Sequence, residues 1–424
     1  MVALGPDRLM APQGAMEGTP GVSRGVEPDE GRSVDSVELA AEDALVLGQS
    51  PNDLNRDIAS MVKEITKIGP KVPEIARRLG RHKETVRYWY KKIEEHNFGI
   101  QAEMDQESMG LRRLVFTVRF GDAYVPYIKP LMMAMADMSY VVGYSRSMPG
   151  DTYVINATPP IERTDDYLDF FDQLRVQGIF TQAEPTVYDQ FRNVPMRTDH
   201  YDFMRGRWEF DGQATEDAPV EFAPSPRRKL DKIDLLLAKE LMIDATRELR
   251  EIQRSIWDID HVEINYKTLC WHLSEHLERN RLLRGYKVNW VGTQYDTKSR
   301  RDLRPQHTYT GSELFVKSPT AEEMNELRAR MAGLPILYSE AVGRDYHAQV
   351  AIPNELMVET LEYLESAIKP VREKSEFIMV DMRYAQSFTL PYLMYEEESH
   401  TWQFNKENLL AKFAEFMIQV KNAH

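Results

Sequence analysis

The chain has 424 residues, of which 42% are hydrophobic and 28% charged, a globular composition that excludes a wholly disordered or collagen-like protein. Its length favours two or more domains. The net charge of −14 argues against a general polyanion binder, although a local basic patch can still bind nucleic acid. The single cysteine, Cys270, excludes a disulfide framework and a thiolate zinc site. We expect a cytoplasmic protein without membrane contact, because no long apolar run and no secretory leader pattern is present.

Residues 1–50 are rich in Gly, Pro, Ser and acidic residues and lack a regular apolar period. This composition predicts a disordered acidic tail. The tail either keeps the protein soluble or contacts a partner or the protein's own basic surface.

Residues 51–105 have the pattern of a winged helix-turn-helix. A first helix is predicted up to Gly69-Pro70, and a short helix, VPEIARRL, ends at Gly80. The third helix is predicted from about His82 to Asn97. Apolar residues at helical spacing predict the buried faces of the first and third helices: Leu54, Ile58, Met61, Val62, Ile65 and Ile68, then Val86, Tyr90 and Ile93.

Residues 110–210 predict a βαββαβ order. LRRLVFTVRF alternates like a strand, and DAYVPYIKPLMMAMADM follows as a helix. SYVVGYSRS and DTYVINATP predict a hairpin through Pro149-Gly150. IERTDDYLDFFDQLRVQG then predicts a helix and IFTQAEPTVYDQF a last strand. This order is typical of a ferredoxin-like antiparallel sheet, here followed by an extension.

The same plan repeats after the expected linker over 211–228. GDTYVINATPPIERTDDYLDFF aligns with GRDYHAQVAIPNELMVETLEYL, and WEFD from Trp208 aligns with WQFN from Trp402. We expect a second winged helix-turn-helix over 229–295, a second ferredoxin-like domain with its extension over 305–404, and a C-terminal helix over 405–424. The predicted fold class is α+β, with two tandem copies of a winged helix-turn-helix followed by a βαββαβ domain.

The third helix of the first copy is basic, since five of the twelve residues in RHKETVRYWYKK are Lys or Arg. Such a helix can enter the major groove, where Arg87 would donate to a guanine edge and Thr85 would contact a phosphate. A solvated charged helix face is the alternative. The residues expected to contact DNA in this copy are Arg81, His82, Lys83, Thr85, Arg87, Tyr88 and Lys91.

The second copy is electrically neutral over residues 228–284 and has Cys270 where the first copy has Arg87. Asn265 is a good N-cap for its third helix. Lys267 and Thr268 are the expected DNA contacts of this copy. Contact with a partner protein through its aromatic residues is the alternative.

His272 and His276 lie four residues apart, a spacing that can ligate a metal. Position 273 is Leu, so the zinc-protease pattern is absent, and no third ligand is evident. We expect surface histidines, no metal site and no cofactor. No phosphate-binding loop, dinucleotide fingerprint or nucleophile elbow is present, so no catalytic residue is assigned and we expect no enzyme.

The segment EIARRLGRHKETVRYWYKKIEEHNFG resembles the winged helix of the Lrp/AsnC (feast/famine) transcription regulators. The hairpin GDTYVINATPPIERTDDYLDFF and its copy resemble the Gly-Asp-Tyr hairpin of that family's ferredoxin-like domain. The resemblance implies a sequence-specific DNA-binding regulator with a tandem duplication of the module. It also implies oligomerisation through the ferredoxin-like domains and, in some members, an amino-acid or other small-molecule effector.

Two alternatives stay open. A sister branch with a similar two-domain plan decarboxylates siroheme, which implies tetrapyrrole binding near His200, His307 or His347. A regulator that acts mainly through contacts with the transcription machinery is the other.

The two ferredoxin-like domains are expected to pack sheet against sheet within one chain, because the linker is long enough for that docking. We also expect a chain homodimer, because the apolar ends WEFD and WQFN need a surface to cover them.

Overall fold

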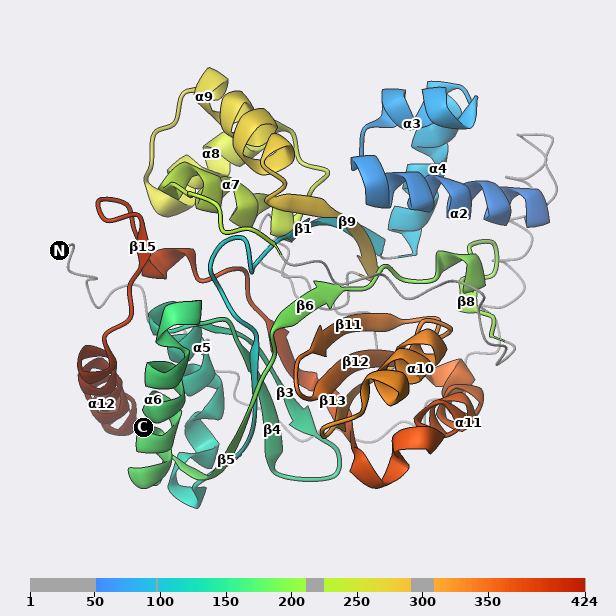
Figure 1. Ribbon diagram of the computed structural model, residues 1–424. Helices are drawn as coiled ribbons and strands as arrows, with labels where there is room; N and C mark the ends of the chain where they lie inside the picture. Colours follow the sequence, from blue (N-terminus) through green and yellow to red (C-terminus); the bar gives the residue numbers. More distant parts are fainter. Residues whose placement is uncertain (1–50, 97, 211–224, 291–308, 424) are drawn as a thin grey trace, which may run out of the picture.

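A computed structural model describes residues 51–96, 98–210, 225–290 and 309–423. The tail expected over 1–50 and most of the linker expected over 211–228 lie outside these ranges. The fold is a mixed α+β arrangement around one large sheet, which confirms the α+β part of the predicted class. Figure 1 shows two helical lobes above this sheet and further helices on both of its sides. Within the described ranges, no helix is long and apolar enough to cross a lipid bilayer.

The first helical lobe contains α2 (Pro51–Ile68), α3 (Val72–Leu79) and α4 (Lys83–Glu95). The apolar stripe predicted for α2 forms its core, and Ile58 and Ile65 on that stripe are fully buried. Gly80 has a φ of 62° and its N–H donates back to the last turn of α3. This left-handed glycine makes the tight turn predicted between α3 and α4.

The inner face of α4 differs from the prediction by one residue. Val86, Trp89 and Ile93 are buried, whereas Tyr90 is only half-buried. Residues three or four positions apart lie on the same side of a helix. The apolar spacing from Val86 therefore allows either Trp89 or Tyr90 to face the core. The structure places the larger indole in the core.

The second helical lobe contains α7 (Lys232–Ile243), α8 (Leu249–Asp260), α9 (Tyr266–Trp271) and the π-helical turn η5 (His272–Arg279). Asn265 caps α9 as predicted, because its side-chain oxygen accepts a hydrogen bond from the N–H of Lys267 at 2.9 Å. The third helix of this lobe consists of α9 followed directly by η5, whose π-helical turns are wider than those of an α-helix.

Two strands join the lobes. β1 (Phe98–Met104) and β9 (Leu283–Trp290) pair antiparallel, with Ile100 opposite Val288. α2 packs against β9, and α7 packs against β1. Each lobe is therefore fastened to the strand that follows the other lobe.

The large sheet has nine strands in the order β5-β2-β4-β3-β13-β10-β12-β11-β6. Its first half contains β2 (Leu114–Phe120), β3 (Val141–Ser147), β4 (Thr152–Ala157), β5 (Phe180–Val187) and β6 (Gln190–Asn193). Its second half contains β10 (Tyr309–Val316), β11 (Leu337–Val342), β12 (Tyr346–Pro353) and β13 (Ser375–Ser387). The helices beside it are α5 (Ile128–Met138), α6 (Thr164–Val176), α10 (Ala321–Met331) and α11 (Met357–Ile368). The order β5-β2-β4-β3 in the first half has its counterpart in β13-β10-β12-β11.

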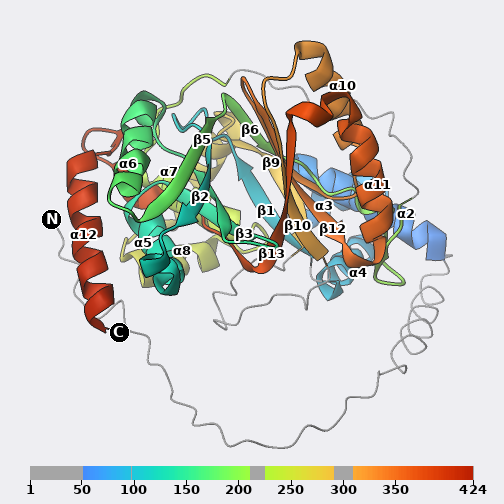
Figure 2. The ribbon, with the colours of Figure 1, turned by 90° about the horizontal axis from the view of Figure 1, so that it is seen from below.

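The last strand of each half extends into the other half. β13 pairs with β10 up to Val380 and then with β3, while β6 follows β5 and pairs with β11. The two halves also touch face to face, since Val115 and Val154 of the first pack with Phe315 and Ala341 of the second. Figure 2 shows the two halves of the sheet with their helices on the outer sides. Sheet-against-sheet contact within one chain is thus present, and shared strand edges reinforce it.

Two short hairpins and a helix follow the halves. They are β7 (Tyr201–Asp202) with β8 (Arg207–Trp208), β14 (Tyr395–Glu396) with β15 (Thr401–Trp402), and α12 (Lys406–Ala423). Trp208 and Trp402 are both buried, and Trp402 Nε1 donates to the carbonyl of Met109 at 2.7 Å. The argument that these apolar ends need a second chain to cover them is therefore wrong.

Candidate functional site

A cavity of about 210 Å³ lies where the two halves of the large sheet face each other. Strands β3, β4, β10, β11, β12 and β13 line it, and β6, α7 and β9 each contribute to its wall. Residues more than two hundred positions apart thus share one wall, which requires both the face-to-face contact and the shared strand edges.

Arg113 brings a guanidinium to this cavity from the position just before β2. The side chain is buried, its Cζ lies 3.7 Å from the centre of the Phe191 ring, and its Nε has no hydrogen-bond partner among the described residues. Burial lowers the pKa of Arg113 to about 10, while the nearby carboxylates of Glu107 and Glu313 act in the opposite direction. The group stays cationic at neutral pH.

Lys287 enters the cavity wall from β9, and its Nζ donates to Asn193 Oδ1 at 3.3 Å. Burial lowers the pKa of Lys287 to about 8, Glu103 offsets part of this effect, and the positive charge of Arg113 adds to it. In the part of the chain that the structure describes, neither Arg113 nor Lys287 has a carboxylate within ion-pair distance. A buried guanidinium and a half-buried ammonium therefore face one cavity, and neither forms an ion pair among the described residues.

The wall formed by β10 and β12 is acidic and tightly bonded. Glu313 Oε2 lies 2.7 Å from Nε2 of His347, and its Oε1 accepts from Ser145 at 3.3 Å and from Gln349 at 3.1 Å. The His347 ring stacks on Phe315, with ring centres 4.6 Å apart. These contacts hold Glu313 in place, so the cavity carries a fixed anion opposite two cations.

This arrangement suits a ligand that carries a carboxylate. A carboxylate can accept from a guanidinium and an ammonium together, and these charge-assisted bonds are strong where water is excluded. The volume lies below the 300–1,000 Å³ of typical small-molecule pockets. It therefore suits a small carboxylate or one arm of a larger ligand.

Sequence patterns did not single out Arg113 or Lys287. Both stand in strand-like segments, LRRLVFTVRF and YKVNW, where a charged residue adjoins apolar ones. A cation at an inward strand position is a signal for a buried site. Which strand positions face inward follows here from pairing between distant strands.

The residues predicted to contact DNA lie on the exposed side of α4 and in the turn before it. Lys83, Arg87 and Lys91 follow one another at four-residue steps and are exposed, while Thr85 and Tyr88 are half-buried. Lys91 lies 3.7 Å from Glu95, and Arg87 pairs with Glu84.

At the start of that helix, Arg81 pairs with Asp57 at 2.9 Å. His82 is the N-cap of this helix, and the Nδ1 of its ring accepts from the N–H of Glu84 at a long distance of 3.4 Å.

The equivalent residues of the second lobe lie on a shorter α-helix. Lys267 is exposed and Thr268 is half-buried, both within α9, which changes into the π-helical turn after Trp271. Tyr266 and Trp271 are exposed beside them. The structure therefore presents Lys267 and two aromatic rings on this surface, and the exposed Arg250 lies with its Cζ 5.4 Å from the centre of the Tyr266 ring.

The two histidines of the second lobe are not the surface residues that the sequence predicted. His272 is buried and His276 half-buried, and both Nδ1 atoms lie within 3.0 Å of the buried carboxylate of Asp234. Asp231 completes a group of four potential metal ligands. The third and fourth ligands were missed because they lie about forty positions earlier in the sequence.

The histidines considered for a tetrapyrrole lie apart. His347 is buried beside the cavity through Glu313, whereas His200 lies at the end of a short turn and packs on Phe210. His307 lies outside the described residues.

Comparison with known proteins gives structural likenesses alone. No family model matches the chain, and no curated protein matches it. Two crystal structures of the siroheme decarboxylase NirDL, one with an iron-uroporphyrin III analogue, are similar over 84% of this chain and 99% of theirs, at 10% identity and TM-scores of 0.48 and 0.47. An AsnC family transcriptional regulator from Agrobacterium tumefaciens is similar over 32% of this chain and 89% of its own, at 16% identity and a TM-score of 0.25.

These likenesses correct one expectation. The prediction that the chain is not an enzyme is contradicted, because the structures similar over 84% of the chain are those of an enzyme. The likeness to AsnC family regulators covers 32% of the chain. At such low identity, neither a reaction nor DNA binding follows from the likeness.

Proposed function

We propose that the central cavity binds a carboxylate-bearing tetrapyrrole and that the chain decarboxylates it, which is the activity that the name of NirDL states for that protein. The observation that carries the proposal is a pair of cations in one cavity, the buried Arg113 and the half-buried Lys287, without ion-pair partners among the described residues. Burial of an unpaired charge is costly, and a carboxylate bound between them offsets that cost.

The two cations would play different parts. Arg113 stays protonated and orients the carboxylate, with Phe191 fixing the guanidinium plane. When the bond to CO₂ breaks, the electron pair remains on the ligand carbon, which then takes a proton. Lys287, with its pKa lowered to about 8, donates that proton and regains one from solvent. A carboxylate arm fits the present volume, and the whole macrocycle requires the walls to separate.

The test is an absorbance titration of the full chain with siroheme. We expect a shift of the Soret band that saturates at one ligand per chain and, on incubation, a loss of mass corresponding to CO₂. Arg113→Met should weaken binding about tenfold or more, because a charged hydrogen-bond pair is lost. The matched control is Arg112→Met, which removes a neighbouring arginine that does not line the cavity. Equal titrations of Arg113→Met and wild type would rule out this site.

A second proposal concerns the first helical lobe, which we infer binds duplex DNA through α4. The supporting observation is the row of exposed cations Lys83, Arg87 and Lys91 on a helix that follows a tight glycine turn. Arg87 would reach a guanine edge and Lys91 a phosphate. A ligand-responsive DNA-binding protein and an enzyme are compatible in one chain, since the two sites lie on different elements.

DNA binding is tested with Arg87→Ala on a site selected from random duplexes. The substitution should cost about 1–3 kcal/mol and relax the preference at one base pair. Lys91→Ala should weaken all sequences alike and flatten the salt slope by about one unit. Arg175→Ala, an exposed arginine of α6, serves as the control. Superimposable curves for Arg87→Ala and wild type would refute the assignment.

We also propose that the chain contains two copies of one module. Each half runs through three helices, a strand and a βαββαβ unit, and the sheet orders of the halves correspond. A shared origin accounts for the repeated sequence segments and for the way each lobe packs on the other's strand.

A further inference from the structure

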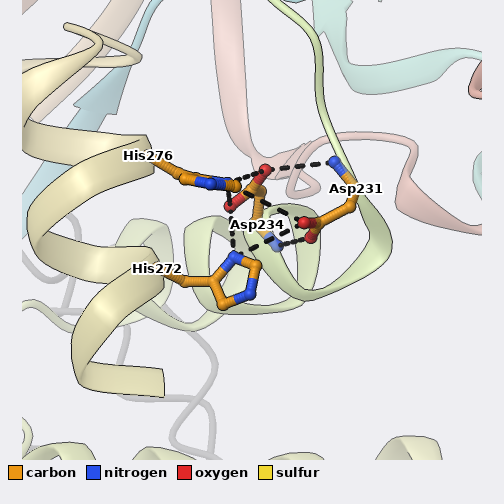
Figure 3. Close-up of side chains that lie close together, drawn as sticks. All are labelled: Asp231, Asp234, His272 and His276. Carbon is orange, nitrogen blue, oxygen red and sulfur yellow. Dashed lines mark hydrogen bonds and ion pairs between the residues drawn. The ribbon is translucent and has the colours of Figure 1, made fainter. Parts of the chain in front are cut away.

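Two carboxylates and two imidazoles converge inside the second helical lobe, away from the central cavity (Figure 3). Asp231 and Asp234 stand at the start of α7, and His272 and His276 project from η5. One ligand atom from each residue lies within 4.8 Å of the others. The group therefore joins the first and the third helix of this lobe.

A capping box holds the carboxylates. Asp231 Oδ1 accepts from the N–H of Asp234, and Asp234 Oδ2 accepts from the N–H of Asp231, both at 3.0 Å. These bonds leave Asp231 Oδ2 and Asp234 Oδ1 on the side of the histidines, and Asp234 Oδ2 also lies 3.0 Å from Nδ1 of His276. The helix start thus provides the supporting hydrogen bonds that orient metal-binding carboxylates.

The imidazoles present the same atom to this pair of oxygens. Nδ1 of His272 and Nδ1 of His276 lie 2.8 Å and 2.9 Å from Asp234 Oδ1, and 3.6 Å and 3.8 Å from Asp231 Oδ2. The π-helical turn carries both rings, whose centres are 4.6 Å apart. π-Helical turns occur frequently at functional sites.

The distances match a four-coordinate divalent ion. Ligand bonds of about 2.0–2.1 Å in a tetrahedron place ligand atoms about 3.4 Å apart. The nitrogen–oxygen distances given above run from 2.8 Å to 3.8 Å, so this separation falls among them. Two imidazole nitrogens and two carboxylate oxygens suit Zn²⁺, whereas Mg²⁺ and Ca²⁺ prefer oxygen ligands alone. The burial of Asp234 and His272 excludes competing water.

We propose that Asp231, Asp234, His272 and His276 bind one Zn²⁺ ion, or a closely similar transition-metal ion, that fastens α7 to η5. Binding through Nδ1 requires neutral, deprotonated nitrogens, so the protons at these positions are released to solvent. The ion would hold the second lobe rigid. This site is independent of the cavity proposed for the tetrapyrrole, so the failure of one proposal leaves the other unaffected.

The test is isothermal titration of chelator-treated full chain with Zn²⁺, followed by thermal unfolding. We expect one Zn²⁺ per chain, no binding of Mg²⁺, and a midpoint of unfolding that rises with Zn²⁺ concentration. Co²⁺ should quench the emission of Trp271, whose ring centre lies 4.4 Å from that of His276. Trp271→Phe should abolish this quenching while Zn²⁺ binding persists.

Two variants locate the ion. His276→Ala should weaken Zn²⁺ binding by more than about tenfold, and its half-buried position makes it a milder change than substitution of His272. Asp231→Asn should also weaken Zn²⁺ binding. Because asparagine keeps a side-chain oxygen that can cap the helix, this variant separates loss of the metal ligand from a folding defect. His261→Asn is the control, because it removes an exposed histidine outside the cluster. The backbone of His261 is left-handed, a conformation that asparagine tolerates. Equal Zn²⁺ affinity in wild type, His276→Ala and Asp231→Asn, or no Zn²⁺ binding by wild type, would overturn the proposal and leave a hydrogen-bonded histidine–aspartate cluster.

Discussion

Lys287 combines a positive charge with a pKa lowered to about 8, and this makes ligand binding sensitive to pH. We expect the affinity of the cavity for a carboxylate ligand to fall as the pH rises from about 7 to 9, because the ammonium that attracts the anion loses its proton. Lys287→Met should bind more weakly at pH 7 and change little over the same range. Binding titrations at several pH values check this, and a flat wild-type profile would contradict it.

The same lysine sets a trend in stability. Its pKa is about 8 in the folded chain and about 10.4 in an unfolded one, so between these values the unfolded state binds more protons and the free energy of unfolding rises with pH. Below pH 8 both states are protonated and the cost of burying the charge is fully present. The stability of wild type relative to Lys287→Met should therefore improve from about pH 8 to 10, as measured by urea unfolding at each pH.

At the scale of elements, the turn from α2 to α3 is fitted to β9. Gly69 has a φ of 77°, and a Cβ there would lie 2.5 Å from Cζ of Tyr286 on β9. Gly69→Ala should therefore cost about 1–3 kcal/mol for the steric clash in addition to about 1–2 kcal/mol for the left-handed backbone.

Gly80→Ala is the matched control for this turn. Gly80 has a φ of 62°, but a Cβ there meets no atom within 4 Å. Its cost should be the backbone contribution alone, about 1–2 kcal/mol. Denaturant unfolding of both variants measures the difference, and equal losses would show that the contact with Tyr286 is not tight.

The third helices of the two lobes differ in their geometry and in the side chains that they expose. α4 is a regular helix with cations on its exposed side, whereas α9 passes into η5 after six residues and turns two histidines inward. This difference agrees with the neutral charge of the second copy. It places the proposed DNA contact on α4 and the proposed metal site under α9.

At the scale of the whole molecule, a buried ion pair connects the two halves. Arg192 of β6 pairs with Glu340 of β11, and Tyr346 donates to the same carboxylate at 2.9 Å. Arg192→Met removes one of two buried arginines beside Glu340, since Arg328 stays 3.5 Å from the same carboxylate, and should lower the free energy of unfolding by about 1.5–3 kcal/mol. Arg163→Met, which breaks an exposed pair with Asp166, should cost less than about 1 kcal/mol. Similar losses in both variants would show that Arg192 does not stabilise the junction.

The expected homodimer now depends on another surface. Trp208 and Trp402 are covered within the chain, so the apolar extensions give no reason for association. The shared strand edges already provide, within one chain, the pairing that two separate chains would otherwise supply. Light scattering of the purified chain determines whether it associates further.

Short-range patterns were sufficient for much of the fold. Apolar residues at a helical period located α2 and α4, local strand and hairpin patterns located β2, β3, β4 and β5, and Gly80 located a turn. These features depend on side-chain directions within one helix or strand, which a stretch of sequence contains in full. The repeated segments predict that one plan occurs twice, and this stays a proposal.

The sites depended on tertiary contacts. Asp234 and His276 are 42 positions apart and meet because α7 packs on η5. Arg113 and Lys287 line one cavity because β9 pairs with β1 and the halves of the large sheet face each other. Whether a charged residue is buried depends on what packs over it, and distant segments provide that cover. No local period encodes that packing, so only the tertiary structure separated Arg113 and Lys287 from the many exposed cations of this chain.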